Sequence, residues 1–148
     1  MQESSYILID IPQSMQAFQS MEVFGAGECG GVGMYVDLTG DNPDYDKASA
    51  IIDLARGQIN AVYGGSYQEG ITRRTVVNVP EGSTIKLNNI FGGAYGVQND
   101  VACDVYESNV NYNSANALVG GYQSGIYGGN NNYRRTLYSK VNINALGK

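Results

Sequence analysis

The chain has no histidine and no tryptophan, and it has only three prolines and two cysteines among 148 residues. Without histidine, no catalytic triad or dyad can use an imidazole base, and no metal site can use imidazole ligands. An enzyme built on this chain would have to work with carboxylates, Lys, Arg or Tyr. A glycosidase in particular would need two carboxylates that face each other across a groove.

Long apolar runs and an excess of positive charge are also missing. No stretch approaches the ~20 apolar residues of a membrane span, and the formal net charge is −5. Nucleic acids and anionic membrane surfaces both attract concentrated basic surfaces. We therefore expect no nucleic-acid partner and no membrane insertion.

The first residues, 1–5, lack the basic and apolar regions of a secretory signal. Two interpretations are open. Either the protein stays in the cytoplasm, or residue 1 begins a segment cut from a longer exported chain. The repeats described next run almost to both ends and leave little room for end caps. This favours the second interpretation, and with it an extracellular or cell-surface location.

Glycine (20 residues) and tyrosine (12 residues) are abundant, and many of them belong to a repeated pattern. An apolar–Asn/Asp–apolar triplet is followed by a turn, and then by an aromatic residue with two small residues. The triplets are Ile9-Asp10-Ile11, Ile52-Asp53-Leu54, Val77-Asn78-Val79, Val110-Asn111-Tyr112 and Val141-Asn142-Ile143. The aromatic corners are Val23-Phe24-Gly25-Ala26, Val62-Tyr63-Gly64-Gly65, Ile90-Phe91-Gly92-Gly93 and Ile126-Tyr127-Gly128-Gly129. Alternation at period two indicates strands, and a fixed order of repeated elements indicates a solenoid.

The repeat predicts an all-β fold: a right-handed parallel β-helix (β-solenoid) of about four coils, forming one domain over residues 1–148. We expect the corner aromatics to stack in the core or at its margin, and the glycine pairs to turn the chain at positive φ. Two segments fit the pattern less well. Residues 46–56 contain good helix formers, but their second half aligns with strands of other repeats. Residues 13–21 are expected to form an irregular lead-in or a short cap.

The aromatic–Gly–Gly corner resembles that of bacterial surface proteins built from right-handed parallel β-helix repeats, of an adhesin-like type. It is carried by Tyr63-Gly64-Gly65, Phe91-Gly92-Gly93 and Tyr127-Gly128-Gly129. The resemblance spans Ile9 to Ile143 and departs from the pattern at Gly25-Ala26 and in the insert that follows. It implies the fold and a surface setting, because members of this group share no single activity or catalytic motif.

The carboxylates give no convincing catalytic or metal site. Asp10 and Asp53 are expected to stack in successive coils, but the same row continues as Asn78, Asn111 and Asn142, which indicates side chains that form hydrogen bonds along the stack or face water. The loop between Asp37 and Asp46 contains four aspartates, but its spacing fits no standard calcium loop. A solvated acidic loop is the favoured interpretation. We therefore name no catalytic, cofactor-binding or metal-binding residue.

The arginine pairs and the cysteines allow two interpretations each. Arg73-Arg74 and Arg134-Arg135 recur at one repeat position and could bind an anionic group, although exposed strand-edge charges are the favoured interpretation. Cys29 and Cys103 fall about 10 Å apart along the predicted stack. That separation is too long for a disulfide unless the insert that carries Cys29 reaches across.

Loop tyrosines are the best candidates for ligand contact. Tyr67, Tyr95, Tyr122 and Tyr133 lie in polar, Asn-rich segments, and a rigid ring offers contact area at low entropy cost. We predict a non-catalytic cell-surface or extracellular module that contacts glycan or protein through these loops, without a cofactor. The alternatives are a structural spacer or fibre segment and, with less support, a polysaccharide lyase or hydrolase. The open ends of the stack are expected to pair with further coils or identical chains.

Overall fold

A computed structural model of the chain describes residues 4–12, 18–33, 49–97, 103–121 and 123–145. Within these ranges the protein is all-β, with parallel sheets and no helix, as the sequence predicts. It follows that this part of the chain contains no helix able to cross a membrane. The strands form three sheets, and none of these sheets closes on itself.

The largest sheet is five-stranded, with the order β1-β3-β5-β8-β11. Its strands are β1 (Ser5–Asp10), β3 (Ser49–Arg56), β5 (Thr72–Val79), β8 (Val105–Tyr112) and β11 (Thr136–Ile143). A four-stranded sheet has the order β2-β4-β7-β10. Its strands are β2 (Phe18–Phe24), β4 (Ile59–Tyr63), β7 (Asn89–Phe91) and β10 (Gly125–Tyr127). Strands β6 (Lys86–Leu87) and β9 (Leu118–Val119) form the third sheet.

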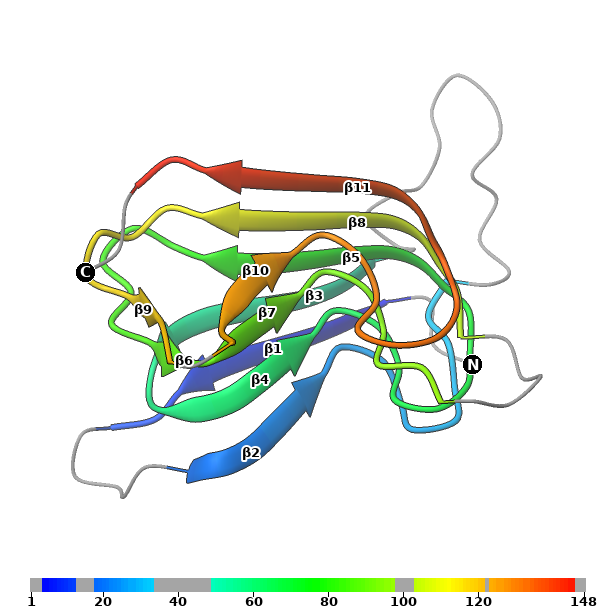
Figure 1. Cartoon of the computed structure of the whole chain (residues 1–148), viewed down its shortest axis with the longest axis horizontal. Helices are drawn as coiled ribbons and strands as arrows, with labels where there is room; N and C mark the ends of the chain where they lie inside the picture. Colours follow the sequence, from blue (N-terminus) through cyan, green and yellow to red (C-terminus); the bar gives the residue numbers. More distant parts are fainter. Residues whose placement is uncertain (1–3, 13–17, 34–48, 98–102, 122, 146–148) are drawn as a thin grey trace.

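The chain visits these sheets in a repeating order. It leaves the five-stranded sheet, crosses to the four-stranded sheet, and returns to the next position in the first (Figure 1). Strands β6 and β9 lie on two of these crossings, between β5 and β7 and between β8 and β10. Each sheet therefore collects the successive copies of one element of the sequence repeat.

Alternation decides which side chains of the five-stranded sheet are buried. In β5, Val77 and Val79 are fully buried, while Asn78 between them is half-buried. Strand pairing places four triplets opposite one another, at Ile52, Val77, Val110 and Val141. This confirms the predicted alignment of those four repeats. The apolar side chains of the first three of these triplets form one core with residues of the other two sheets and with Ile85, which precedes β6; the sheet residues include Ile59, Val62, Leu87 and Ile90.

The first strand departs from the predicted alignment by two residues. Ile7, and not Ile9, lies opposite Ile52, and Leu8 lies opposite Asp53. Both Ile7 and Ile9 pack against the core. A shift of two residues keeps every side chain on its own face of the sheet, so apolar alternation cannot distinguish the two alignments.

Two ambiguous segments form strands. The second half of residues 46–56 belongs to β3, as predicted, although it contains good helix formers. The prediction of an irregular lead-in over residues 13–21 is wrong from residue 18 onward, because β2 begins at Phe18 and pairs with β4. Tertiary pairing outweighs the weak local pattern at both places.

The corner glycines are required for a reason other than the predicted one. Glycines with positive φ occur at other turns of the described chain, and the Gly64-Gly65 and Gly92-Gly93 pairs are not among them. Instead, a Cβ on Gly25 would strike the carbonyl of Gly64, and a Cβ on Gly64 would strike the carbonyl of Gly92. Close backbone contact between successive corners therefore selects glycine.

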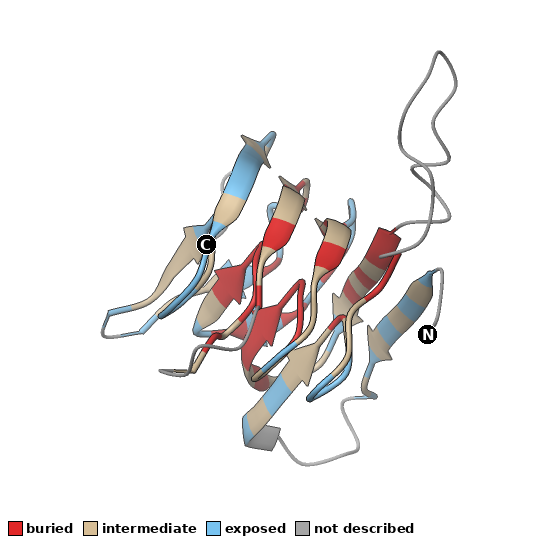
Figure 2. Cartoon of the chain, turned by 90° about the vertical axis from the view of Figure 1, so that its right-hand side faces the viewer, coloured by how far each residue is buried: buried red, intermediate tan, exposed pale blue. Residues whose placement is uncertain are grey.

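Burial is concentrated in the middle of the stack and falls toward both ends (Figure 2). Val77 and Val110 are fully buried, whereas Val141, at the same position in β11, is 38% exposed. At the other end, Ile7 of β1 is half-buried, whereas Ile52, at the same position in β3, is fully buried. The end strands thus carry apolar side chains that no described residue covers.

Candidate functional site

The four corner aromatics form a continuous column along the four-stranded sheet. The ring centroids of Phe24 and Tyr63 are 4.8 Å apart, those of Tyr63 and Phe91 are 4.9 Å apart, and those of Phe91 and Tyr127 are 4.8 Å apart. The interplanar angles are 10° or less. The predicted stacking is confirmed. Tyr63 and Phe91 have both ring faces covered by neighbouring rings and are buried, whereas Tyr127, the last ring of the column, is 43% exposed.

A second pair of rings packs against this column. Tyr67 and Tyr95 lie 5.1 Å apart, and each meets the column edge-on, Tyr67 at Phe24 and Tyr95 at Tyr63. Both are half-buried. Two of the predicted contact tyrosines are therefore held in the aromatic cluster itself and do not project freely from loops.

A groove of about 490 Å³ follows the exposed side of the column. Its lining combines aromatic rings with side-chain amides and one carboxylate. The lining residues are Glu22, Asn60, Ala61, Tyr63, Asn89, Phe91, Tyr95, Gln123, Tyr127, Asn130 and Asn131. Glu22 is the sole carboxylate among these described residues, and they include no lysine or arginine.

Several groove amides are already oriented by hydrogen bonds. Asn131 Nδ2 donates to the Tyr63 hydroxyl at 3.3 Å, and Asn60 Nδ2 donates to Glu22 Oε1 at 3.3 Å. Asn130 Oδ1 accepts the backbone N–H of Ala94 at 2.8 Å. The whole amide of Asn130 is engaged, because its Nδ2 also donates to the carbonyls of Cys103 and Tyr133. Asn60 and Asn131 line the groove with amides that these bonds hold in place. Such a surface can form hydrogen bonds with the hydroxyl groups of a ligand.

No protein-family model, curated protein or solved structure matches the chain. The functional argument therefore depends on the site alone, because a fold by itself does not define an activity.

The structure brings together two of the four predicted contact tyrosines. Tyr95 lines the groove, and Tyr67 supports Tyr95 from behind. Tyr133 is 46% exposed and does not line the groove, and Tyr122 lies outside the described residues. Sequence reasoning missed the contributions of Tyr127, Gln123 and the strand asparagines. Strand alternation could have identified two of the lining residues. Glu22 and Asn89 each lie two residues before a corner aromatic, so they lie on the same face of the strand as that ring.

The asparagine row is a hydrogen-bonded ladder, as predicted. The Nδ2 of Asn78 donates to Asp53 Oδ1 at 2.8 Å, that of Asn111 to Asn78 Oδ1 at 2.9 Å, and that of Asn142 to Asn111 Oδ1 at 2.7 Å. Every amide points its donor toward the preceding strand. The Tyr6 hydroxyl donates to the second oxygen of Asp53 at 2.8 Å. Asp53 is thus an acceptor that ends the row, and its role in the fold is structural.

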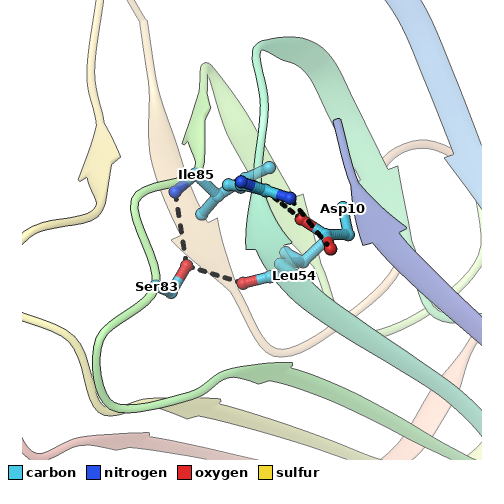
Figure 3. A network of polar contacts seen from close by, with 5 residues as sticks. Asp10, Leu54, Ser83 and Ile85 are labelled. Carbon is cyan, nitrogen blue, oxygen red and sulfur yellow. Dashed lines mark hydrogen bonds and ion pairs between the residues drawn. The ribbon is translucent and has the colours of Figure 1, made fainter. Parts of the chain in front are cut away.

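Asp10 does not stack on Asp53, contrary to the prediction. It lies opposite Arg56 and forms an ion pair with that guanidinium, near the Leu54–Ser83–Ile85 contacts (Figure 3). The shift of β1 by two residues is the cause. The predicted stacking of Asp10 on Asp53 is therefore wrong.

The remaining charged and sulfur groups have partners or lie outside the groove. Arg74 lies 3.7 Å from Glu107, Arg135 lies 3.1 Å from Asp104, and Arg73 stacks over the Tyr106 ring. Cys29 and Cys103 are both free. The described residues contain no cluster of three or more His, Cys, Asp or Glu side chains that could hold a metal ion. The acidic loop between Asp37 and Asp46 lies outside the described residues.

We expect the protein to lose stability in alkali through Tyr63. Burial, and then the charge of Glu22, raise the pKa of Tyr63 from 10.0 to about 12. The folded state therefore favours the neutral phenol, and this stabilisation is complete below pH 10 and disappears as the pH rises from 10 to 12. The loss is about 2 kcal/mol.

Urea denaturation between pH 9 and pH 12 measures this effect. Tyr63→Phe keeps a ring in the column, and it should reduce the alkaline fall in unfolding free energy. Tyr138→Phe, at a residue that is 74% exposed, should leave the fall unchanged. An identical alkaline fall in Tyr63→Phe and the parent would show that Tyr63 does not carry the effect.

Proposed function

We propose that the three parallel sheets are the faces of a right-handed parallel β-helix, and that this helix is a non-catalytic module which binds neutral glycans. The in-register strand pairings and the repeated order of sheet visits support the β-helix. Parallel crossover connections are almost always right-handed. On this interpretation β1–β2, β3–β4, β5–β7 and β8–β10 are four coils, and β11 begins a fifth.

The groove along the aromatic column is the observation that carries the binding proposal. Sugars combine apolar C–H faces with many hydroxyl groups, and a site for them needs aromatic surface together with amide donors and acceptors. The groove supplies both, with Tyr127 as its most exposed ring and with Gln123, Asn60 and Asn131 as amides. Because the stacked rings cover each other's faces, Tyr127 provides the main ring platform, and the amides provide most of the polar contacts.

Charge favours a neutral glycan over an acidic one. The lining includes Glu22 and no described lysine or arginine, and the whole chain has a net charge of −5. A uronate or a sulfated sugar would meet like charge in this groove without a cationic partner. Hexose and N-acetylhexosamine oligomers meet no such penalty.

Binding without cleavage follows from the same lining. Glycoside hydrolysis requires a pair of carboxylates across the scissile bond, and the described groove residues supply only Glu22. We expect no release of product from a panel of plant, host and microbial polysaccharides. Product formation that is lost in Glu22→Gln would contradict the non-catalytic part of the proposal.

A panel of neutral and acidic oligosaccharides, followed by titration calorimetry on the hits, tests the binding proposal. We expect weak binding of neutral oligomers that falls about tenfold in Tyr127→Ala and several-fold in Gln123→Ala. Gln123 is exposed and makes no side-chain hydrogen bond to a described residue, so its replacement should leave the fold intact. Tyr138→Ala, on the other sheet, is the matched control. Absence of neutral hits, or equal binding by all three variants and the parent, would refute the proposal.

A structural role as a spacer or fibre segment is the second candidate. The exposed apolar residues of β11 favour it, because Val141 and Ile143 occupy positions that are buried at Val110 and Tyr112 in the neighbouring strand. An extracellular or cell-surface location suits both functions and stays a proposal here.

A further inference from the structure

A second hollow lies beside the groove, where the third sheet meets the four-stranded sheet. It has a volume of about 330 Å³, and its lining includes Gln58, Lys86, Asn88 and Leu118. None of these four residues lines the groove along the aromatic column. Strand β6 carries Lys86 and leads through Asn88 directly into β7, which carries groove residues (Figure 1). We call this depression the Lys86 hollow.

A hydrogen-bonded row of side chains connects the Lys86 hollow with the groove. Asn88 lines the hollow and Asn60 lines the groove. The Nδ2 of Asn88 donates to Asn60 Oδ1 at 3.0 Å, and the Nδ2 of Asn60 donates to Glu22 Oε1 at 3.3 Å. The backbones are joined as well, because the Asn88 N–H donates to the Asn60 carbonyl at 2.9 Å. A ligand that lies along this row would therefore contact both depressions.

The two depressions carry opposite charges. Glu22 is the sole charged side chain among the described lining residues of the groove, and Lys86 is the sole one among those of the hollow. Lys86 is exposed, and strand pairing places uncharged residues on both sides of it, Gln58 and Leu118. Its ammonium forms no ion pair or hydrogen bond with a described residue. No described residue therefore neutralises the positive charge in the hollow.

We propose that the Lys86 hollow binds the acidic end of an oligosaccharide whose neutral sugar units occupy the groove. The inference rests on the proposed glycan binding and narrows its ligand to a mostly neutral oligomer with one terminal carboxylate. Lys86 pairs with that carboxylate, and Leu118, which is 38% exposed, contacts the C–H groups of the same unit. Charge also fixes the direction of the ligand, because the reverse orientation would bring the carboxylate toward Glu22. A glycan with a carboxylate on every unit would meet the same repulsion.

Titration calorimetry with three forms of one oligosaccharide tests the proposal. The probes are a neutral oligomer that binds the protein, the same oligomer oxidised to a carboxylate at its reducing end, and the same oligomer oxidised at C6 of its other end. We expect one of the two acids to bind about threefold more tightly than the neutral oligomer, the size of effect that an exposed ion pair gives. In about 1 M NaCl this advantage should disappear, whereas the affinity for the neutral oligomer should stay the same.

Variants of the protein locate the acidic group. Lys86→Gln should remove the advantage of the acid and leave the affinity for the neutral oligomer unchanged, because Lys86 is exposed and supports no described contact. Lys140→Gln removes the same charge from an exposed residue of the five-stranded sheet and should leave both affinities unchanged. If neither acid binds more tightly than the neutral oligomer, or if Lys86→Gln keeps the advantage, this inference is overturned while the glycan proposal stands. Absence of binding by all three probes would overturn both.

Discussion

Gly64→Ala is expected to lower the free energy of unfolding by about 3 kcal/mol or more, which is a large part of the ~5–15 kcal/mol typical of a folded domain. The added Cβ would strike the carbonyl of Gly92 and lie 2.7 Å from the Cβ of Thr75. Neither group can move cheaply. The Gly92 carbonyl accepts the Thr75 hydroxyl, and the Gly64 N–H donates to the Phe91 carbonyl at 2.9 Å. Relief of the clash would therefore push apart the turns that follow β4 and β7, which are neighbouring strands in the middle of the four-stranded sheet.

Gly30→Ala is the matched control. A Cβ at Gly30 meets no atom within 4 Å, and its φ lies outside the positive range. We expect a change within about 0.5 kcal/mol. Urea denaturation followed by circular dichroism at 25 °C measures both variants. Equal midpoints for Gly64→Ala and Gly30→Ala would show that the corners are not in close contact.

Asn78→Asp is expected to lower the free energy of unfolding by about 2 kcal/mol at pH 7. The cause is the added charge, because the two side chains have nearly the same volume. The wild-type amide donates to Asp53 at 2.8 Å. In the variant, two carboxylates would face each other at that distance with no donor between them. We expect the pKa of the new carboxyl to rise, because a shared proton relieves the repulsion. Stability should therefore recover as the pH falls from about 6 to 4, which is opposite to ordinary acid denaturation.

Asn142→Asp separates this effect from the simple loss of an amide. Position 142 is the end of the row, and its neighbour is the amide oxygen of Asn111 and not a carboxylate. We expect the free energy of unfolding to fall by less than about 1 kcal/mol at pH 7 and to recover little as the pH is lowered. Stability curves that are parallel for both variants between pH 4 and pH 7 would argue against charge repulsion within the row.

The sequence predicts those parts of the structure that depend on periodicity. Alternation identifies the strands, and repetition predicts that Ile52, Val77, Val110 and Val141 share one position. The same logic places the four corner aromatics in a column. It also places Asn78, Asn111 and Asn142 in one row, with hydrogen bonds along the stack as one of two predicted arrangements, and the structure has those bonds.

The sequence pattern could not predict features that depend on how closely successive repeats approach one another. The shift of β1 by two residues preserves alternation, so no sequence signal opposed the wrong pairing of Asp10 with Asp53. The corner glycines are needed because successive backbones touch, and nothing in one repeat reveals how closely the next approaches. The groove combines Glu22, Asn60 and Gln123 from distant segments. Its composition becomes visible only when the sheets are placed side by side.

The one-way direction of the asparagine ladder bears on how the chain folds. A parallel strand that slips by two residues keeps its apolar side chains inside and loses little hydrophobic energy. Between β3 and β5, however, the slip would place Asn78 opposite Ile51 or Ala55 and break its hydrogen bond to Asp53. Folding intermediates with this shifted pairing should therefore be less stable, although their buried apolar contacts are preserved. The bond between Asn78 and Asp53 thus favours the correct alignment of β5 on β3, whereas β1, which has Leu8 opposite Asp53, has no amide in the row to oppose a shifted pairing.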